Sequence, residues 1–348
     1  MTEHLIDRIR DLSKEEIQFL LEHYTTEDAA YAKAKARKTT DDIFGRNVYI
    51  RGLIEISNIC KNNCYYCGIR SANANVIRYR LEKPQILSCC REGYRLGFRT
   101  FVLQGGEDPF YTDAVLTEIV QTIKQEFPDC AVTLSLGERS DDSYARLRAA
   151  GADRYLLRHE TAAAPHYAML HPASMSFQNR MHCLHVLKST GWQTGCGMMV
   201  GSPYQTAETL AEDLIFLRSF RPQMVGIGPF IPARHTPFEK EPAGSTALTL
   251  FLISLIRLML PYALIPATTA LQTLRADGRI CGLDAGANVI MPNLSPAKLR
   301  GQYALYDNKA NARIDTAQEL EKIGDQLAQA GYTILTDRGD YREDAGKI

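Results

Sequence analysis

Short β-rich runs alternate with stretches of helical periodicity along most of the chain. Eight runs of apolar and β-branched residues, separated by helix-length segments, predict strands. They cover residues 48–56, 100–104, 131–135, 154–158, 193–200, 224–230, 264–267 and 288–291. Amphipathic helices are predicted between them, and Gly151 and Gly191 are expected to end two of these as C-caps. The repeated unit, without a low-complexity linker, predicts an α/β protein with a single (β/α)8 TIM-type barrel. A partial barrel with fewer units is the alternative.

Helical patterns precede the first predicted strand. Ser13 with Glu16 forms a capping box that opens one helix, and Thr26, followed by two acidic residues, opens another. The organisation expected is N-terminal helices packed on the barrel at 1–46, the barrel itself at 47–308, and a C-terminal helix and strand extension at 309–348.

Several charged residues are predicted to point into the barrel. Alternate residues of a barrel strand face inward, so Arg154 and Arg158 share one face with Glu160, which follows the strand. Unpaired charges in a sealed core are costly, so these groups either pair with one another or surround a polar ligand. We favour the ligand.

Composition excludes several classes of function. The 348 residues are 45% hydrophobic and 23% charged, which is typical of a folded globular protein. Forty Lys and Arg balance forty Asp and Glu without a basic run, so a nucleic-acid partner is not expected. The most apolar stretch, 247–260, is too short to span a bilayer and contains Arg257, so it predicts a buried helix. With no signal-peptide pattern at the start, we expect a cytoplasmic protein without membrane contact.

Three of the nine cysteines follow the first predicted strand directly. Cys60, Cys64 and Cys67 form a C-x3-C-x2-C arrangement. Thiolates at this spacing can bind three irons of a 4Fe-4S cubane and leave the fourth iron open to an amine and a carboxylate. A structural zinc site would need a fourth ligand, and Cys89 and Cys90 are adjacent rather than spaced for chelation. A ferredoxin-type carrier would need a fourth cysteine followed by proline, which is absent.

This cysteine run, with an aromatic residue before its last cysteine, resembles the signature of the radical SAM superfamily. Gly105, Gly106 and Glu107 after the second strand could form only a tight turn, but beside the cysteines they resemble the superfamily's Gly-Gly-Glu element. The resemblance implies one 4Fe-4S cluster held by the three cysteines, with S-adenosylmethionine on the open iron. It implies reductive cleavage of S-adenosylmethionine to a 5'-deoxyadenosyl radical. The residues implied to contact S-adenosylmethionine are Tyr66, Gly105, Gly106, Glu107, Ser135, Glu160 and Arg180.

Longer strings resemble the HydE family of FeFe-hydrogenase maturases, whose relatives include biotin synthase and methylornithine synthase. These strings span 133–138, 151–161, 224–232, 265–269 and 286–293. The resemblance implies radical attack on sulfur of a small cysteine-derived, iron-bound substrate, in assembly of the diiron subcluster of the H-cluster. Other maturases and an external electron donor are the implied partners. The implied substrate pocket is lined by Arg154, Arg158, Met224, Thr268, Thr269, Met291 and Tyr303, although each Met or Thr alone could be an ordinary core or strand residue.

Two departures narrow the expectation. No cysteine follows Cys281, so the accessory cluster that many HydE-like chains bind near the C-terminus is not expected. Only Cys196 lies within a predicted central strand, which disfavours sulfur insertion of the biotin synthase kind. A methylornithine-synthase-like radical mutase and a non-enzymatic iron-sulfur scaffold stay open as alternatives. No role is assigned to His159 beside the two arginines, because a lone strand histidine is more often structural.

Overall fold

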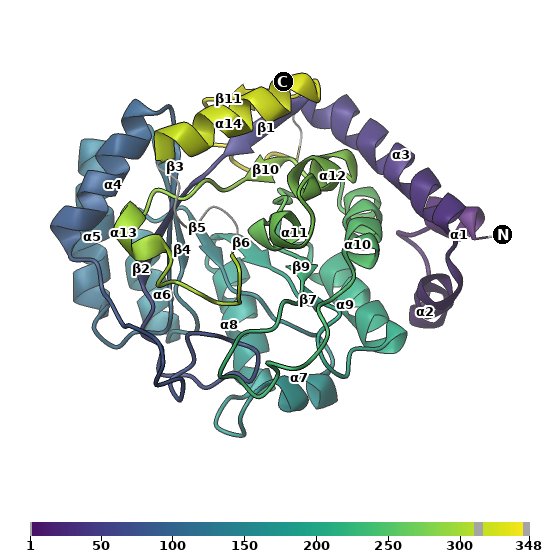
Figure 1. Cartoon of the computed structure of the whole chain (residues 1–348), viewed down its shortest axis with the longest axis horizontal. Coiled ribbons are helices and arrows are strands. Elements are labelled where there is room, and N and C mark those ends of the chain that lie inside the picture. The colour runs from purple at the N-terminus through teal and green to yellow at the C-terminus, as the bar shows by residue number, and fades with distance from the viewer. Residues whose placement is uncertain (1, 310–315, 344–348) are drawn as a thin grey trace.

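The strands form a parallel barrel that helices surround (Figure 1). The computed structural model describes residues 2–309 and 316–343. Six strands pair in parallel and in chain order along most of the barrel wall. They are β2 (Gly52–Ser57), β3 (Thr100–Gly105), β4 (Ala131–Ser135), β5 (Arg154–Leu156), β6 (Gln193–Cys196) and β8 (Met224–Val225).

Isolated bridges close the ring. Met224 pairs with Leu264, and Pro266 pairs with Val289 of β10 (Val289–Ile290). β10 in turn pairs with β1 (Asn47–Ile50), and Asn293 just beyond it bridges to Leu53 of β2. The segment predicted as a strand at 264–267 therefore occupies the seventh position without a continuous ladder, since Pro266 has no N–H to donate. Eight positions in a closed ring confirm the predicted (β/α)8 barrel.

Three predicted strands are each split in two. The first divides into β1 and β2, the fifth into β6 and β7 (Met199–Val200), and the sixth into β8 and β9 (Gly228–Pro229). Gly197 lies at one of these breaks with φ +154°, and a Cβ there would come within 2.0 Å of the Gly226 carbonyl oxygen. The two strands approach so closely there that position 197 has no room for a side chain.

Helices cover the outside of the barrel. Gly151 and Gly191 follow the ends of α6 and α8 with positive φ, as their predicted roles require. Arg257 of the apolar helix α10 is fully buried and donates to the carbonyl oxygens of Gly286 and Pro261. The helices of the barrel are α4 (Lys83–Arg95), α5 (Asp113–Glu126), α6 (Asp141–Ala149), α7 (Ala164–Leu170), α8 (Phe177–Ser189), α9 (Ala207–Phe220), α10 (Thr246–Met259), α11 (Thr269–Leu274), α12 (Gly278–Asp284) and α13 (Ala297–Arg300). Of these, α11 lies inside the ring of helices (Figure 1).

Both flanks of the chain pack on the barrel. α1 (Glu3–Asp7) precedes α2 (Lys14–His23), which lies against α9 and begins with the predicted capping box at Ser13. α3 (Thr26–Phe44) lies along α10. After α14 (Thr316–Gln329), β11 (Thr333–Leu335) adds in parallel to the free side of β1. In the ranges that the structure describes, no helix is long and apolar enough to cross a membrane.

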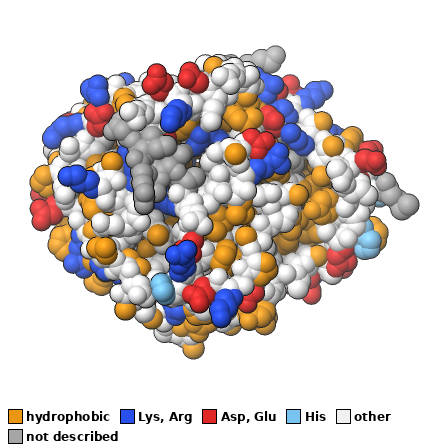
Figure 2. Space-filling model, in the orientation of Figure 1, with side chains coloured by type: hydrophobic (Ala, Val, Ile, Leu, Met, Phe, Trp, Pro, Cys, Tyr) orange, Lys and Arg blue, Asp and Glu red, His pale blue; other side chains and the backbone are white. Residues whose placement is uncertain are grey.

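The segment after β11 closes the N-terminal end of the barrel. Asp340 accepts a hydrogen bond from Arg154, the first residue of β5, at 2.6 Å. It accepts another from Gln193, the first residue of β6, at 3.0 Å. The Gly339 carbonyl oxygen accepts one from Arg51 at 3.2 Å. The inward charge of Arg154 is therefore balanced by the chain itself. Elsewhere, charged side chains of both signs are interspersed over the face shown in Figure 2.

Candidate active site

A cavity of about 350 Å³ opens at the C-terminal ends of the strands. Its wall combines the loop after β2 with the ends of β3, β4 and β5, and with residues from α8 and the loop before α14. All ten residues that the resemblance implied for the cluster and for S-adenosylmethionine line it. They are Cys60, Cys64, Tyr66, Cys67, Gly105, Gly106, Glu107, Ser135, Glu160 and Arg180.

The cysteine loop is anchored to the Gly-Gly-Glu turn. The Gly106 N–H donates to the Ser57 carbonyl oxygen at 3.0 Å, and the Lys61 N–H donates to that of Glu107 at 3.0 Å. A Cβ on Gly106 would lie 2.2 Å from the Ile59 carbonyl oxygen and 2.7 Å from Cys60 Cβ. Only glycine at position 106 allows the Gly-Gly-Glu turn to approach the cysteine loop this closely. This close approach is the physical reason for a glycine at that position of the motif.

Asp108, which follows the Gly-Gly-Glu turn, holds the two ends of the cysteine loop together. The buried Asp108 carboxylate accepts two hydrogen bonds from Arg80, at 2.6 and 2.9 Å, and one from Ser57 at 2.7 Å. Burial alone would raise the pKa of Asp108, but Arg80 and Ser57 lower it overall. An ionised aspartate thus ties Ser57 at the end of β2 to Arg80, which follows the cysteine loop and forms an isolated bridge with Ser57.

The three thiols are half-buried, and burial raises the pKa of each. The pKa of Cys67 rises to about 12, chiefly through burial and then through the neighbouring Cys60. Free thiols here are protonated near neutral pH, so binding of a metal group would release protons. Within 2–309 and 316–343, no three His, Cys, Asp or Glu side chains surround a point where one metal ion could bind. A cubane does not require such a point, because each of its cysteines binds a different iron.

Two acidic residues and one arginine shape the wall next to the cysteines. Glu107 accepts a hydrogen bond from the Glu138 N–H at 2.9 Å, and its other oxygen lies 3.2 Å from Lys61 Nζ. Arg180 donates from Nε to Glu138 at 2.7 Å and from Nη1 to the Arg158 carbonyl oxygen at 2.5 Å. The guanidinium of Arg180 is held rigidly at the cavity, as a carboxylate site requires.

Some polar groups at the cavity have no hydrogen-bond partner. Buried atoms without one are Nε and Nη2 of Arg158, Oε2 of Glu160 and Oγ1 of Thr268. Arg158 Nη2 lies 3.2 Å from Glu160 Oε2 as an ion pair. Glu160 also has φ +65°, a left-handed conformation that is uncommon for a residue with a side chain. Of these atoms, Arg158 Nε and Thr268 Oγ1 have neither a hydrogen bond nor an ion pair, and because buried polar atoms are normally satisfied they indicate a wall built for a polar ligand.

The seven residues implied for the substrate do not all meet. Arg158, Thr268, Thr269 and Tyr303 line the cavity. Arg154 lies at the opposite end of the barrel, where Asp340 binds it. Met224 and Met291 pack there in an apolar cluster with Phe44, Tyr49 and Leu264. Strand parity predicted an inward position for Arg154 and Arg158 alike, but it does not distinguish one layer of a barrel interior from the next, and the other five residues were implied by the resemblance alone.

The cavity also contains residues that the sequence analysis did not identify. Gln104 donates to the Tyr303 hydroxyl at 3.3 Å, and its place at the end of a strand could have indicated it. Met175, whose sulfur lies 3.6 Å from Cys64 Sγ, and Tyr306 come from loops in which no pattern marks them.

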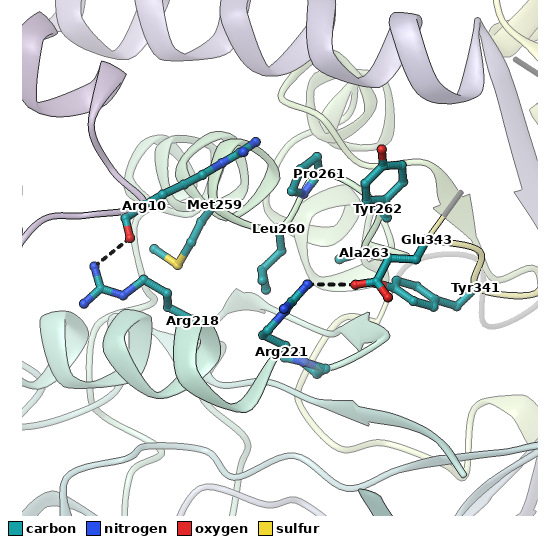
Figure 3. Close-up of a pocket in the computed structure, with 11 residues that line it drawn as sticks. Arg10, Arg218, Arg221, Met259, Leu260, Pro261, Tyr262, Ala263, Tyr341 and Glu343 are labelled. Atoms are coloured by element: carbon teal, nitrogen blue, oxygen red, sulfur yellow. Dashed lines mark hydrogen bonds and ion pairs between the residues drawn. The ribbon is translucent and has the colours of Figure 1, made fainter. Parts of the chain in front are cut away.

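A second cavity, of about 380 Å³, lies between α9, α10 and the C-terminal segment (Figure 3). Arg221 pairs with Glu343 at 2.7 Å, and Arg218 donates to the Arg10 carbonyl oxygen at 3.1 Å. None of the described residues that line it is a cysteine or a histidine. The larger cavity is therefore not the one that contains the candidate metal ligands, because the three clustered cysteines line the first cavity.

Comparison with known proteins identifies the family. The family model of the Radical SAM superfamily matches residues 54–217. The FeFe hydrogenase maturase subunit HydE of Thermotoga maritima is 48% identical over 265 residues, which is 76% of this chain and 75% of that protein. The chain belongs to the radical SAM superfamily. It is therefore a radical SAM enzyme, and membership implies a 4Fe-4S cluster and S-adenosylmethionine.

Other radical SAM proteins share most of the chain length. The 3-methylornithine synthase of Methanosarcina acetivorans is 30% identical over 305 residues, 87% of this chain and 85% of that protein. The crystal structure of methylornithine synthase (PylB) superposes with a TM-score of 0.81 at 26% identity, covering 96% of this chain and 97% of the other. The crystal structure of HydG, a maturase of the FeFe-hydrogenase, shares the fold. Its TM-score is 0.79 at 19% identity, and the superposition covers 96% of this chain and 75% of the HydG chain. The predicted membership and fold are confirmed.

The cavity fits the cofactors of a radical SAM enzyme. Three cysteines on one loop would supply the thiolates, and Gly105 and Gly106 line the cavity beside them. The fixed guanidinium of Arg180 offers a site for a carboxylate, and the Glu160 carboxylate, whose Oε2 has an ion pair with Arg158 but no hydrogen bond, offers one for hydroxyl groups. Donor types and unsatisfied groups thus agree with a nucleoside that carries an amino-acid moiety.

Proposed function

We propose that this enzyme is of the HydE type and acts on a small cysteine-derived, iron-bound substrate during assembly of the diiron subcluster of the FeFe-hydrogenase H-cluster. The observation that carries the proposal is the convergence of ten implied cofactor residues on one cavity, in a chain 48% identical to a HydE protein. Cys60, Cys64 and Cys67 would hold the only cluster. When bound, the cluster supplies the electron that cleaves S-adenosylmethionine into methionine and a 5'-deoxyadenosyl radical.

The protein's own part is to bind and orient S-adenosylmethionine. Glu107 and the backbone at Gly105 and Gly106 would receive the methionyl ammonium group, and Arg180 its carboxylate. Ser135 and Glu160 would contact the nucleoside and its ribose, with Tyr66 beside the cysteines. Holding the reacting groups in fixed geometry replaces a costly encounter in solution.

The substrate would lie beside these residues, against Arg158, Thr268, Thr269 and Tyr303. Arg158 Nε is buried without a partner and Nη2 is paired only with Glu160 at 3.2 Å, so the guanidinium has a donor left for a carboxylate. The hydroxyl of Thr268 is likewise unpartnered. We leave Arg154, Met224 and Met291 out of the proposed substrate site, because the structure places them at the other end of the barrel.

The proposal also includes the setting of the reaction. We expect a cytoplasmic enzyme that receives electrons from an external donor and contacts other hydrogenase maturases transiently. A second C-terminal cluster is not expected, because no cysteine follows Cys281. Part of the segment at 309–317, where such cysteines would be sought, lies outside the described residues.

A methylornithine-synthase-like mutase is the second candidate. It is supported by 30% identity to a 3-methylornithine synthase and by the TM-score of 0.81 to PylB. The two functions require the same cluster and S-adenosylmethionine. They differ only in the second substrate, which is the compound that the 5'-deoxyadenosyl radical attacks.

One anaerobic experiment tests these functions. The reconstituted enzyme is given reductant, S-adenosylmethionine and either lysine or a cysteine-derived substrate, and the products are identified by mass spectrometry. We expect 5'-deoxyadenosine and modification of the cysteine-derived compound. Methylornithine would overturn the maturase assignment, and an intact cluster that yields no 5'-deoxyadenosine would favour a scaffold. Cys64→Ser should bind little iron, while Cys281→Ser, outside the cavity, should behave like the wild type.

A further inference from the structure

A buried histidine–aspartate pair lies behind the cavity wall. His159, after β5, and Asp213, in α9, are both 0% exposed, and His159 Nε2 lies 3.2 Å from Asp213 Oδ1. The Gly197 N–H donates to His159 Nδ1 at 3.2 Å. Because Nδ1 accepts a hydrogen bond from the Gly197 N–H, it carries no proton. The ring proton is therefore on Nε2, which donates a hydrogen bond to Asp213.

The pair fixes the backbone on both sides of Glu160. Asp213 Oδ1 also accepts the Ala162 N–H at 2.5 Å, and the Glu160 N–H donates to the Gly197 carbonyl oxygen at 3.0 Å. The same Gly197 thus binds His159 through its N–H and Glu160 through its carbonyl group. His159 packs against Phe216, with ring centroids 4.9 Å apart, and does not line the cavity.

Glu160 needs such support. Its φ of +65° is sterically unfavourable for a residue with a Cβ and persists only where the surroundings impose it. This conformation leaves the Glu160 carboxylate at the cavity, where Oε2 has no hydrogen bond and lies 3.2 Å from Arg158 Nη2, while the side chain of the preceding residue points into the wall. The conformation of the turn at 158–162 therefore determines where the Glu160 carboxylate lies.

We propose that His159 and Asp213 are positioning residues, which hold the strained turn at Glu160 so that its carboxylate binds the ribose hydroxyl groups of S-adenosylmethionine. The inference rests on the proposed role of Glu160. It requires no contact between either residue and the nucleoside, because the pair acts through the backbone at 160–162 and 197.

His159→Phe removes both hydrogen bonds and keeps an aromatic ring against Phe216. In the reconstituted holoenzyme, we expect the affinity for S-adenosylhomocysteine, measured by calorimetry, to fall about tenfold with unchanged iron content. His159→Gln restores a donor toward Asp213 and should recover part of the affinity. The matched control is His182→Gln, because His182 and Asp141 form a pair of the same kind at 3.0 Å but are 57% and 58% exposed.

Hydrogen exchange separates positioning from a general loss of stability. In His159→Phe, amides at 158–162 should exchange faster while those of β3 and β4 stay protected. Exchange that increases uniformly over the barrel would overturn the inference in favour of a merely structural role. If His159→Phe does not fold, Asp213→Asn provides the same measurement, with a smaller expected effect because an amide oxygen can still accept from Ala162.

A double-mutant cycle connects the pair to Glu160. In a Glu160→Ala background, His159→Phe should weaken S-adenosylhomocysteine binding by less than about twofold, because the group it positions is gone. Full additivity would contradict the inference. If Glu160→Ala alone leaves affinity unchanged, the proposed S-adenosylmethionine site is wrong, whereas a loss in Glu160→Ala without one in His159→Phe rejects only the positioning role.

Discussion

Arg154 and Asp340 form an ion pair of 2.6 Å that joins the interior of the barrel to the C-terminal segment. Arg154 is fully buried, and Asp340 also accepts from Arg338 at 2.7 Å and from Gln193 at 3.0 Å. Burial alone would raise the pKa of Asp340, but Arg338 and the charge of Arg154 lower it to about 2. Asp340 is therefore ionised at neutral pH and compensates a charge that would otherwise be buried alone.

Removing that carboxylate should destabilise the fold. We expect Asp340→Asn to lower the free energy of unfolding by about 3 kcal/mol, because it leaves the buried guanidinium of Arg154 uncompensated. Denaturant titration of the metal-free chain measures the change. Glu343→Gln serves as control, since Glu343 pairs with Arg221 and both side chains are exposed, so its effect should stay within about 0.5 kcal/mol. Equal effects of the two variants would contradict this account.

Gly106→Ala should disturb the cysteine loop. The added Cβ would lie 2.2 Å from the Ile59 carbonyl oxygen and 2.7 Å from Cys60 Cβ, so the loop has to move. We expect the reconstituted variant to bind much less iron than the wild type, as measured by iron analysis and visible absorption. Gly324→Ala is the control, because a Cβ there meets no atom within 4 Å. Wild-type iron content in Gly106→Ala would show that the loop tolerates the shift.

His171 should make folding sensitive to acid. Its Nε2 lies 3.1 Å from the Tyr66 hydroxyl and its Nδ1 lies 2.9 Å from the Tyr167 carbonyl oxygen. Burial lowers the pKa of His171 from 6.5 to about 3. Between these values the unfolded chain binds a proton that the folded chain does not, so stability is retained above pH 6.5 and is lost as pH falls toward 3.

The expected slope is about 1.4 kcal/mol per pH unit for one such proton. Denaturant titrations of the metal-free chain between about pH 7 and pH 5 measure it. Burial also lowers the pKa of His166, which adds to the slope with the same sign. His171→Gln should remove the contribution of one proton and leave the rest. An unchanged slope in this variant would show that His171 is protonated in the folded protein.

Thr268→Val separates binding from folding. The Thr268 hydroxyl is buried at the cavity without a partner, and it makes no capping hydrogen bond although Thr268 is the N-cap of α11. Its removal should therefore change the free energy of unfolding by less than about 1 kcal/mol. If the hydroxyl binds the second substrate, the KM for that substrate should rise about tenfold, while 5'-deoxyadenosine formation without it stays unchanged. An unchanged KM would remove Thr268 from the proposed site.

Short-range patterns predicted the barrel, and they identified the residues that line the cavity around the three cysteines. The cysteine spacing and the Gly-Gly-Glu turn are local in sequence, and each follows a strand, so the parallel barrel brings them to one end. Helix starts such as the capping box at Ser13 were equally readable, because one turn of chain contains all their contacts.

Longer-range relations could not be predicted in the same way. Asp340 is 186 residues from Arg154, and no pattern connects them, so inward parity alone could not show that Arg154 serves the fold. Met224 and Met291 illustrate the same limit, since position along the barrel axis depends on strand stagger. His159 left no signal either, because Asp213 reaches it from a helix whose register only the packed structure fixes.

Both hydrogen-bonded neighbours of β1, which are β10 and β11, come from the last third of the chain. During synthesis on a ribosome, this apolar strand therefore emerges early and keeps two open edges until nearly everything else has been translated. Such late pairing predicts slow folding of the nascent protein and a long interval of vulnerability to aggregation. Yield in a heterologous host should accordingly respond to chaperone supply and growth temperature.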